Sequence, residues 1–102
     1  MSINVGRYVF EGPYASTAYL QDRAGVYAIH CQLGGVYTLV DVGESATLKT
    51  RAETHDRQTC WRRSCAGTLT VSVLYTPQLH QSERMKIEQE IRSEFAPVCG
   101  VR

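Results

Sequence analysis

The chain has 102 residues, of which 11 are Lys or Arg and 10 are Asp or Glu, so its net charge is +1 at pH 7. Hydrophobic residues make up 43% and charged residues 21%, which is ordinary for one globular domain with a modest core. This balance excludes a uniformly basic nucleic-acid-coating protein and an acidic tail, although it permits a local basic patch.

The first 24 residues carry aromatic side chains and predict an irregular N-terminal lead-in packed on the domain, with one short strand at most. Residues 25–31 and 36–42 are rich in β-branched and aromatic residues, and each predicts a strand. Gly34 and Gly35 lie between them and favour a tight turn. The two strands are therefore expected to form an antiparallel hairpin.

The register of this hairpin decides which side chains meet across it. A turn centred on Gly34 places Tyr27 opposite Asp41 and Ile29 opposite Leu39. Because side chains alternate along a strand, these four residues are then expected on one face of the sheet.

A helix of about three turns is expected next, with Ser45 as its N-cap and an end near Arg57. Arg51 and His55 are four residues apart on this helix, so they project from the same side. The alternating segment at 68–76 then predicts a third strand.

A second helix is expected from about residue 79 to residue 95, with Pro97 after its end. Its apolar stripe places Glu88 at the edge that faces the core. A carboxylate there is costly unless it pairs with a cation, for which Arg51 and Arg84 are candidates, or binds a metal ion.

These elements predict an α/β (α+β) sandwich with a three-stranded, mainly antiparallel sheet flanked by helices. No apolar run approaches the roughly 18 residues of a membrane span, and the N-terminus lacks the pattern of a signal peptide. We therefore expect a cytoplasmic protein.

The chain has four cysteines: Cys31, Cys60, Cys65 and Cys99. In the cytoplasm they are expected to be reduced. No pair has the Cys-x-x-Cys spacing, so small buried thiols are the simpler interpretation. The alternative is a zinc-stabilised interaction domain in which Cys60 and Cys65 bind the metal together with His55 and His80.

Several short patterns resemble the GIY-YIG nuclease superfamily. Gly25-Val26-Tyr27 matches the first motif, and Asp41-Val42-Gly43 stands at the second with Asp in place of Tyr. Arg51 and His55 follow at the family's spacing, and so does Glu88 ahead of a closing proline. Residues 25–102 are thus expected to form a GIY-YIG-like catalytic domain.

Two further positions depart from the family pattern. Gly100 stands where the family usually has Asn, and Glu44 stands where relatives often carry Lys or Gln. These departures, together with Asp41, keep a second possibility open, namely a catalytically silent module on the same fold that binds nucleic acid or protein.

The resemblance implies a divalent-metal-dependent endonuclease that hydrolyses DNA, with RNA as another possible substrate and a homodimer as a possible assembly. Glu88 would hold one Mg²⁺ or Mn²⁺ ion, and Arg51 would clamp a phosphate. Tyr27 would act as the general base or orient water. Asp41 would accept a proton or add a second metal ligand, or would merely pair with Arg51. His55 would contact phosphate or shuttle a proton, or would be a satisfied core histidine.

The segment at 49–63 has a local charge of +3, because five basic residues stand against two acidic ones. A basic segment with an aromatic residue suits nucleic acid. The candidate DNA-binding residues are Lys49, Arg57, Trp61, Arg62 and Arg63. The alternative is that these charges are simply solvated and that Trp61 packs in the core.

Overall fold

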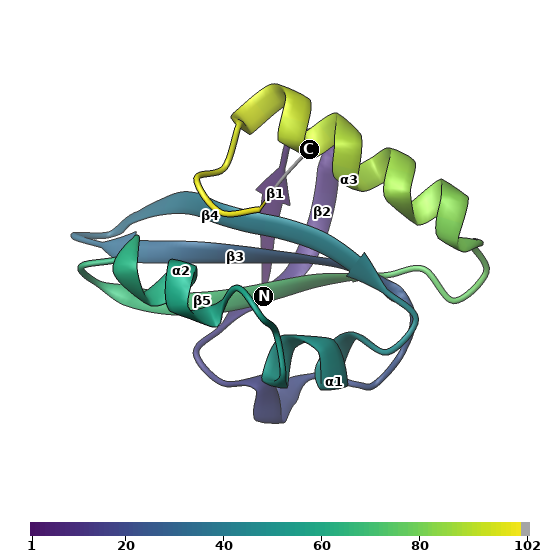
Figure 1. Ribbon diagram of the computed structural model, residues 1–102, viewed down its shortest axis with the longest axis horizontal. Helices are drawn as coiled ribbons and strands as arrows, with labels where there is room; N and C mark the ends of the chain where they lie inside the picture. The colour runs from purple at the N-terminus through teal and green to yellow at the C-terminus, as the bar shows by residue number, and fades with distance from the viewer. Residues whose placement is uncertain (101–102) are drawn as a thin grey trace.

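The computed structural model describes residues 1–100, which form one five-stranded sheet with helices on both faces (Figure 1). The strands are β1 (Ser2–Val5), β2 (Tyr8–Tyr14), β3 (Gly25–Leu33), β4 (Val36–Ser45) and β5 (Thr68–Tyr75). The helices are the short 3₁₀ helix η1 (Thr17–Tyr19), α1 (Leu48–Glu53), α2 (Gln58–Arg63) and α3 (Gln81–Phe95). All neighbouring strands are antiparallel, in the order β1-β2-β5-β3-β4.

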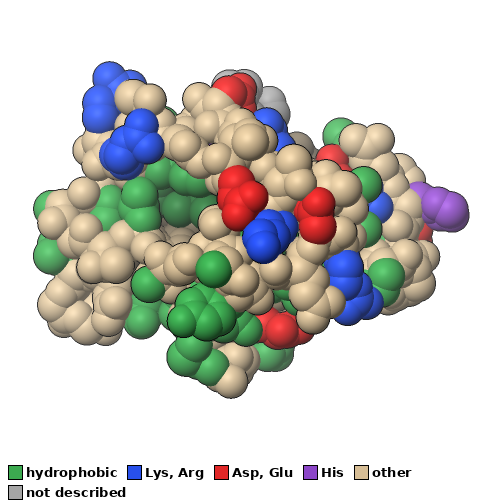
Figure 2. Space-filling model, turned by 90° about the horizontal axis from the view of Figure 1, so that it is seen from below, with side chains coloured by type: hydrophobic (Ala, Val, Ile, Leu, Met, Phe, Trp, Pro, Cys, Tyr) green, Lys and Arg blue, Asp and Glu red, His purple; other side chains and the backbone are tan. Residues whose placement is uncertain are grey.

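The helices divide the core into two layers. Helix α3 covers one face of the sheet, where Ile91 packs with Val26 and Ala28 of β3, and α1 and α2 lie on the other face (Figure 1). There, Tyr27 of β3 packs with Trp61 of α2. Alternate residues of β3 thus enter different layers, which explains why this strand is apolar on both sides. On the α1 and α2 face the cover is incomplete, and apolar side chains line a hollow (Figure 2).

The expected class, an α+β fold with an antiparallel sheet, is confirmed, but the expectation of three strands is wrong. The first 24 residues are not an irregular lead-in, since they contain β1 and β2, and β2 pairs with β5. The register shifts between Glu11 and Tyr14, and Gly12 between them has a φ of +113°. This irregularity interrupts the simple alternation by which a strand is recognised in a sequence.

The hairpin turns where expected, but its predicted register is wrong. Gly34 and Gly35 form a two-residue turn, each with positive φ, so Leu33 pairs with Val36. The register then shifts again at Val40, which adds one residue to β4.

As a result of this bulge, Tyr27 lies opposite Gly43 and Asp41 lies opposite Ile29. Tyr27 and Asp41 therefore remain close, but as diagonal neighbours and not as a direct pair. A bulge of this kind cannot be inferred from turn position alone.

The expected single helix is also wrong, because the chain forms two short helices, α1 and α2, with a break between them. At the break, His55 is buried, and its Nδ1 accepts a hydrogen bond from the backbone N–H of Arg57 at 3.0 Å. This side-chain contact competes with helical hydrogen bonding. The third strand and the last helix are confirmed, with ends within about two residues of those expected.

The expectation of reduced thiols is wrong, and with it the zinc alternative. Disulfides join Cys31 to Cys65 and Cys60 to Cys99, with Cα–Cα distances of 5.4 and 6.0 Å, and no cysteine is free. Both bridges attach the α2 region, one to β3 and the other to the C-terminal loop. These distances depend on tertiary packing, which the spacing of cysteines does not reveal.

No helix within residues 1–100 is long and apolar enough to cross a membrane.

Reduction of the two disulfides is expected to lower the free energy of unfolding by roughly 2–5 kcal/mol per bridge, because each cross-link restricts the unfolded chain. The measurement is urea denaturation with and without a thiol reductant. Alkylation followed by mass spectrometry checks the premise, since labelling of the unreduced protein at any cysteine would contradict the pairing. A Cys60→Ser/Cys99→Ser variant keeps only the Cys31–Cys65 bridge, so reduction should lower its free energy of unfolding by about half as much as in the wild-type chain.

Candidate active site

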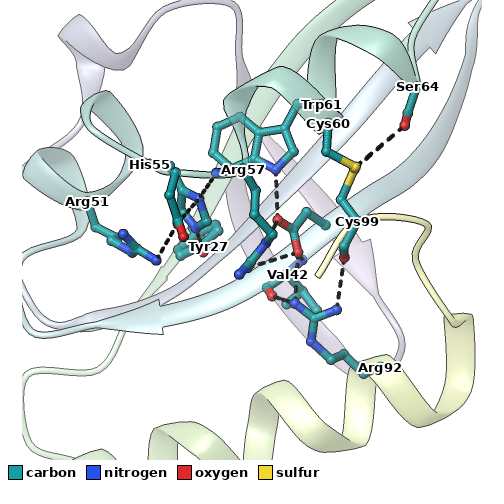
Figure 3. Close-up of polar contacts among 12 residues, drawn as sticks. Tyr27, Val42, Arg51, His55, Arg57, Cys60, Trp61, Ser64, Arg92 and Cys99 are labelled. Atoms are coloured by element: carbon teal, nitrogen blue, oxygen red, sulfur yellow. Dashed lines mark hydrogen bonds and ion pairs between the residues drawn. A yellow bond between two sulfur atoms is a disulfide. The ribbon is translucent and has the colours of Figure 1, made fainter. Parts of the chain in front are cut away.

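The centre of the site is the carboxylate of Asp41 on β4, which is fully buried. Four groups donate to it: Arg57 through Nε at 2.8 Å, Trp61 through Nε1 at 2.7 Å, Arg92 through Nη2 at 2.8 Å and the N–H of Val42 at 2.8 Å (Figure 3). These donors occupy both carboxylate oxygens. Asp41 is therefore a structural anchor in this arrangement and has no free oxygen for a metal ion or a water proton.

Arg92 of α3 connects this anchor to the rest of the site. Its guanidinium is buried, donates to Asp41 and to the carbonyl oxygen of Val42, and reaches Glu88 Oε2 at 3.1 Å and the carbonyl oxygen of Cys99 at 3.1 Å. Gly100 leaves room for this guanidinium, since a Cβ at that position would be 2.5 Å from Nη2. The Gly100 departure from the family pattern is thus coupled to the presence of Arg92.

The sequence reasoning missed Arg92, and the ion-pair partners that it named are wrong. Glu88 pairs with Arg92 and not with Arg51 or Arg84, while Arg84 pairs with Glu44 at 3.0 Å. The signal was available, because Arg92 follows Glu88 by four residues on one helix. Its pairing with Asp41 is a tertiary contact.

Tyr27 and His55 form the second part of the site. The Tyr27 hydroxyl is hydrogen-bonded to His55 Nε2, and both side chains are buried. Because His55 Nδ1 accepts from the backbone N–H of Arg57, the neutral imidazole carries its proton on Nε2 and donates it to the Tyr27 oxygen. Gly43 makes room for this hydroxyl, since a Cβ there would overlap the Tyr27 oxygen.

The surroundings set the protonation of this pair. Burial, and then the carboxylate of Asp41, raises the pKa of Tyr27. Burial, and then the positive charges of Arg51 and Arg57, lowers the pKa of His55 to about 4. At neutral pH the pair consists of a neutral phenol and a neutral imidazole.

Arg51 and Glu88 lie close enough to Tyr27 for their charges to act on its pKa, Arg51 lowering it and Glu88 raising it. Arg51 is half-buried and donates to the exposed carboxylate of Asp56 at 3.1 Å. Glu88 is 17% exposed. The charges of Arg51 and Glu88 therefore both act on Tyr27, while a catalytic role for Tyr27, His55, Arg51 and Glu88 stays a prediction.

The candidate DNA-binding residues separate into two groups. Lys49 on α1 and Arg62 and Arg63 on α2 have accessible side chains. Arg57 and Trp61 are instead committed to the Asp41 carboxylate, and Trp61 is only 6% exposed. The interpretation of Trp61 as a core residue is the one that the structure supports.

The metal-binding capacity of the site is small. Within residues 1–100, no three or more His, Cys, Asp or Glu side chains converge in a way that would hold a metal ion. Glu88 uses Oε2 for Arg92, and Oε1 makes no hydrogen bond within the described part of the chain. Mg²⁺ typically keeps several waters and binds through one or two carboxylates. The donor that such an ion would use here is the free Oε1 of Glu88.

Comparison with solved structures identifies the fold. The chain resembles a crystal structure of the GIY-YIG N-terminal endonuclease domain of UvrC from Thermotoga maritima, a point mutant bound to its catalytic divalent cation. The TM-score is 0.60 at 15% sequence identity, over 84% of this chain and 91% of that one. The chain therefore has the GIY-YIG endonuclease fold. No protein-family model matches the chain, and no curated protein matches it significantly.

An Asp41→Asn substitution is expected to destabilise the protein by about 3–5 kcal/mol, because it leaves two guanidinium groups facing a neutral, buried side chain. Urea denaturation measures the loss. Asp56→Asn is the matched control, since Asp56 also pairs with an arginine but is 75% exposed, and it should leave stability almost unchanged. Equal effects of the two substitutions would contradict the anchoring role.

Acidification is expected to destabilise the protein as the pH falls from 7 to 5. The pKa values of His30 and His55 are lowered to about 4 in the folded state, chiefly by burial. The unfolded histidines, with pKa values near 6.5, bind protons first, so each costs roughly 2 kcal/mol at pH 5. Denaturation at a series of pH values tests this, and a flat profile across this range would contradict it.

Proposed function

We propose that this chain is a divalent-cation-dependent endonuclease that hydrolyses phosphodiester bonds in DNA. The observation that carries the proposal is the buried, hydrogen-bonded Tyr27–His55 pair with the guanidinium of Arg51 beside it (Figure 3). The charges of Arg51 and Glu88 both act on Tyr27. The fold adds support, since the matched UvrC domain is described as an endonuclease with a catalytic divalent cation.

Arg51 would bind the phosphate. Its guanidinium is half-exposed, and its present partner, Asp56, is an exposed carboxylate that a phosphate can replace at little cost. A planar guanidinium donates two parallel hydrogen bonds to phosphate oxygens. In this way Arg51 would orient the scissile group and offset the charge that develops on it.

Tyr27 would orient the attacking water. Because His55 donates to the Tyr27 oxygen, the phenol proton is free to point toward another acceptor, and the same donation would stabilise a phenolate. Burial and the carboxylate of Asp41 oppose that ionisation. Arg51 favours it, so phosphate-bound Arg51 and the Tyr27–His55 pair would act as one unit.

Glu88 would hold the divalent ion, Mg²⁺ or Mn²⁺, through its free carboxylate oxygen. When bound, such an ion stabilises negative charge on the phosphate and on the leaving oxygen. The contact with Arg92 would fix the rotamer of Glu88. Asp41 would support this arrangement indirectly, because it holds Arg92 and Arg57 in place.

A catalytically silent nucleic-acid-binding module on the same fold is the second candidate. The observation that favours it is the contact of Arg92 with both Asp41 and Glu88, because a guanidinium already neutralises the two carboxylates.

The cytoplasmic location expected from the sequence stays a proposal, and the two disulfides weigh against it because such bonds persist in oxidising compartments.

A Glu88→Gln substitution is expected to reduce Mg²⁺- or Mn²⁺-dependent nicking of supercoiled plasmid by at least about a hundredfold, since it removes the charge that holds the ion. Arg51→Ala should cause a loss of similar order. Glu94→Gln, which alters an exposed glutamate on the same helix, is the matched control and should retain wild-type activity.

The outcome also separates the two candidate functions. Plasmid that stays intact with either ion, together with retained DNA binding, would overturn the nuclease proposal and support the silent module.

A further inference from the structure

A hollow of about 280 Å³ lies on the sheet face that carries α1 and α2 (Figure 2). Its walls are mostly apolar. They include Tyr14 of β2, Ile29 of β3, Trp61 of α2, and Leu69 and Val71 of β5. Trp61 donates its indole N–H to the buried Asp41 and also lines the hollow, so a single side chain links the two sites.

Polar groups of α2 stand at the edge of the hollow. Gln58 donates its amide to the carbonyl oxygens of Ala52 and Glu53, which leaves its own side-chain oxygen as an acceptor. Arg62 is exposed, and its contact within the described residues is with Thr59 Oγ1 at 3.5 Å, not with a carboxylate. The edge therefore offers a hydrogen-bond acceptor and a cation that is free to meet an anion.

We propose that this hollow binds one unpaired nucleobase of a bound nucleic acid, while Arg62 contacts the neighbouring phosphate. The volume is near the lower end of ligand pockets, about 300 Å³, which suits a single planar ring system. Bases have π-faces that pack on aromatic and apolar walls and polar edges that reach an acceptor.

Charge complementarity favours a polynucleotide over an apolar peptide as the occupant. Arg62 and its exposed neighbour Arg63 face solvent on the same helix. A base inside a duplex is stacked and paired, so only a base that is single-stranded or extruded from the helix can enter. The inference rests on the proposed function in taking nucleic acid as the partner, but it does not require that the chain cleaves it.

The test compares three DNA probes of equal length, with the wild-type chain and EDTA present so that no cleavage occurs. One probe is fully paired, one carries a single bulged nucleotide, and one carries an abasic residue at the same bulge. The probe with the bulged nucleotide is expected to bind the chain about tenfold more tightly than the fully paired probe or the abasic probe. Because Trp61 is the single tryptophan, its fluorescence should change with the bulged base alone.

Two pairs of variants locate the effect. Ala15→Leu narrows the hollow and should abolish the preference for the base, whereas Ala18→Leu, an exposed position in η1 that does not line the hollow, should retain it. Arg62→Gln should weaken binding of the bulged probe several-fold more than Arg63→Gln does, because only Arg62 lines the hollow.

Equal affinity for the bulged and abasic probes, with unchanged Trp61 fluorescence, would overturn the inference. A fluorescence response to an apolar peptide but not to DNA would also overturn it and would assign the hollow to a protein partner. The two proposals fail separately. Plasmid nicking without any base preference would overturn the proposed base-binding hollow and leave the nuclease proposal intact. A base preference without nicking would overturn the nuclease proposal and leave the base-binding hollow intact.

Discussion

The burial of one ionised carboxylate is the constraint on which this structure depends. A charge removed from water is costly unless oppositely charged groups and hydrogen bonds surround it. Asp41 meets that requirement with donors from three parts of the chain: Arg57 and Trp61 around α2, Arg92 of α3 and the backbone of β4. Helices on opposite faces of the sheet thereby bind the same carboxylate group. The Cys60–Cys99 disulfide also joins α2 to the loop that follows α3.

This anchor and the proposed chemistry share their supports. The backbone of Arg57 fixes the imidazole of His55, and the guanidinium of Arg92 holds the carboxylate of Glu88. The buried carboxylate of Asp41 therefore pairs with the fully buried guanidinium of Arg92 and with the partly exposed guanidinium of Arg57. The arrangement orders the residues around Tyr27, but it also places positive charge beside Glu88, which weakens attraction for a cation.

The arginines are divided between internal ion pairs and the surface. Several arginines form ion pairs within the protein, with Asp41, Glu44 and Glu88, whereas Arg62 and Arg63 are exposed at the surface. A basic stretch in the sequence is thus only partly a basic surface. The accessible portion of that charge lies beside an apolar hollow, and this combination suits an unpaired base better than duplex DNA alone.

The sequence by itself determined the central hairpin, the strand β5 and the helix α3, because local periodicity encodes these features. Motif spacing singled out Tyr27, Arg51, His55 and Glu88 as candidates for one site, and their catalytic role stays a prediction. Only the tertiary structure decided the strands β1 and β2, the bulge at Val40, the two disulfides and the pairing of Arg92 with Asp41. Each of these depends on contacts between residues far apart in the chain, or on an irregularity that breaks the alternation of side chains. Asp41 shows the difference most clearly: its position matched a motif, but its environment, which makes it an anchor, is assembled from α2, α3 and β4 together.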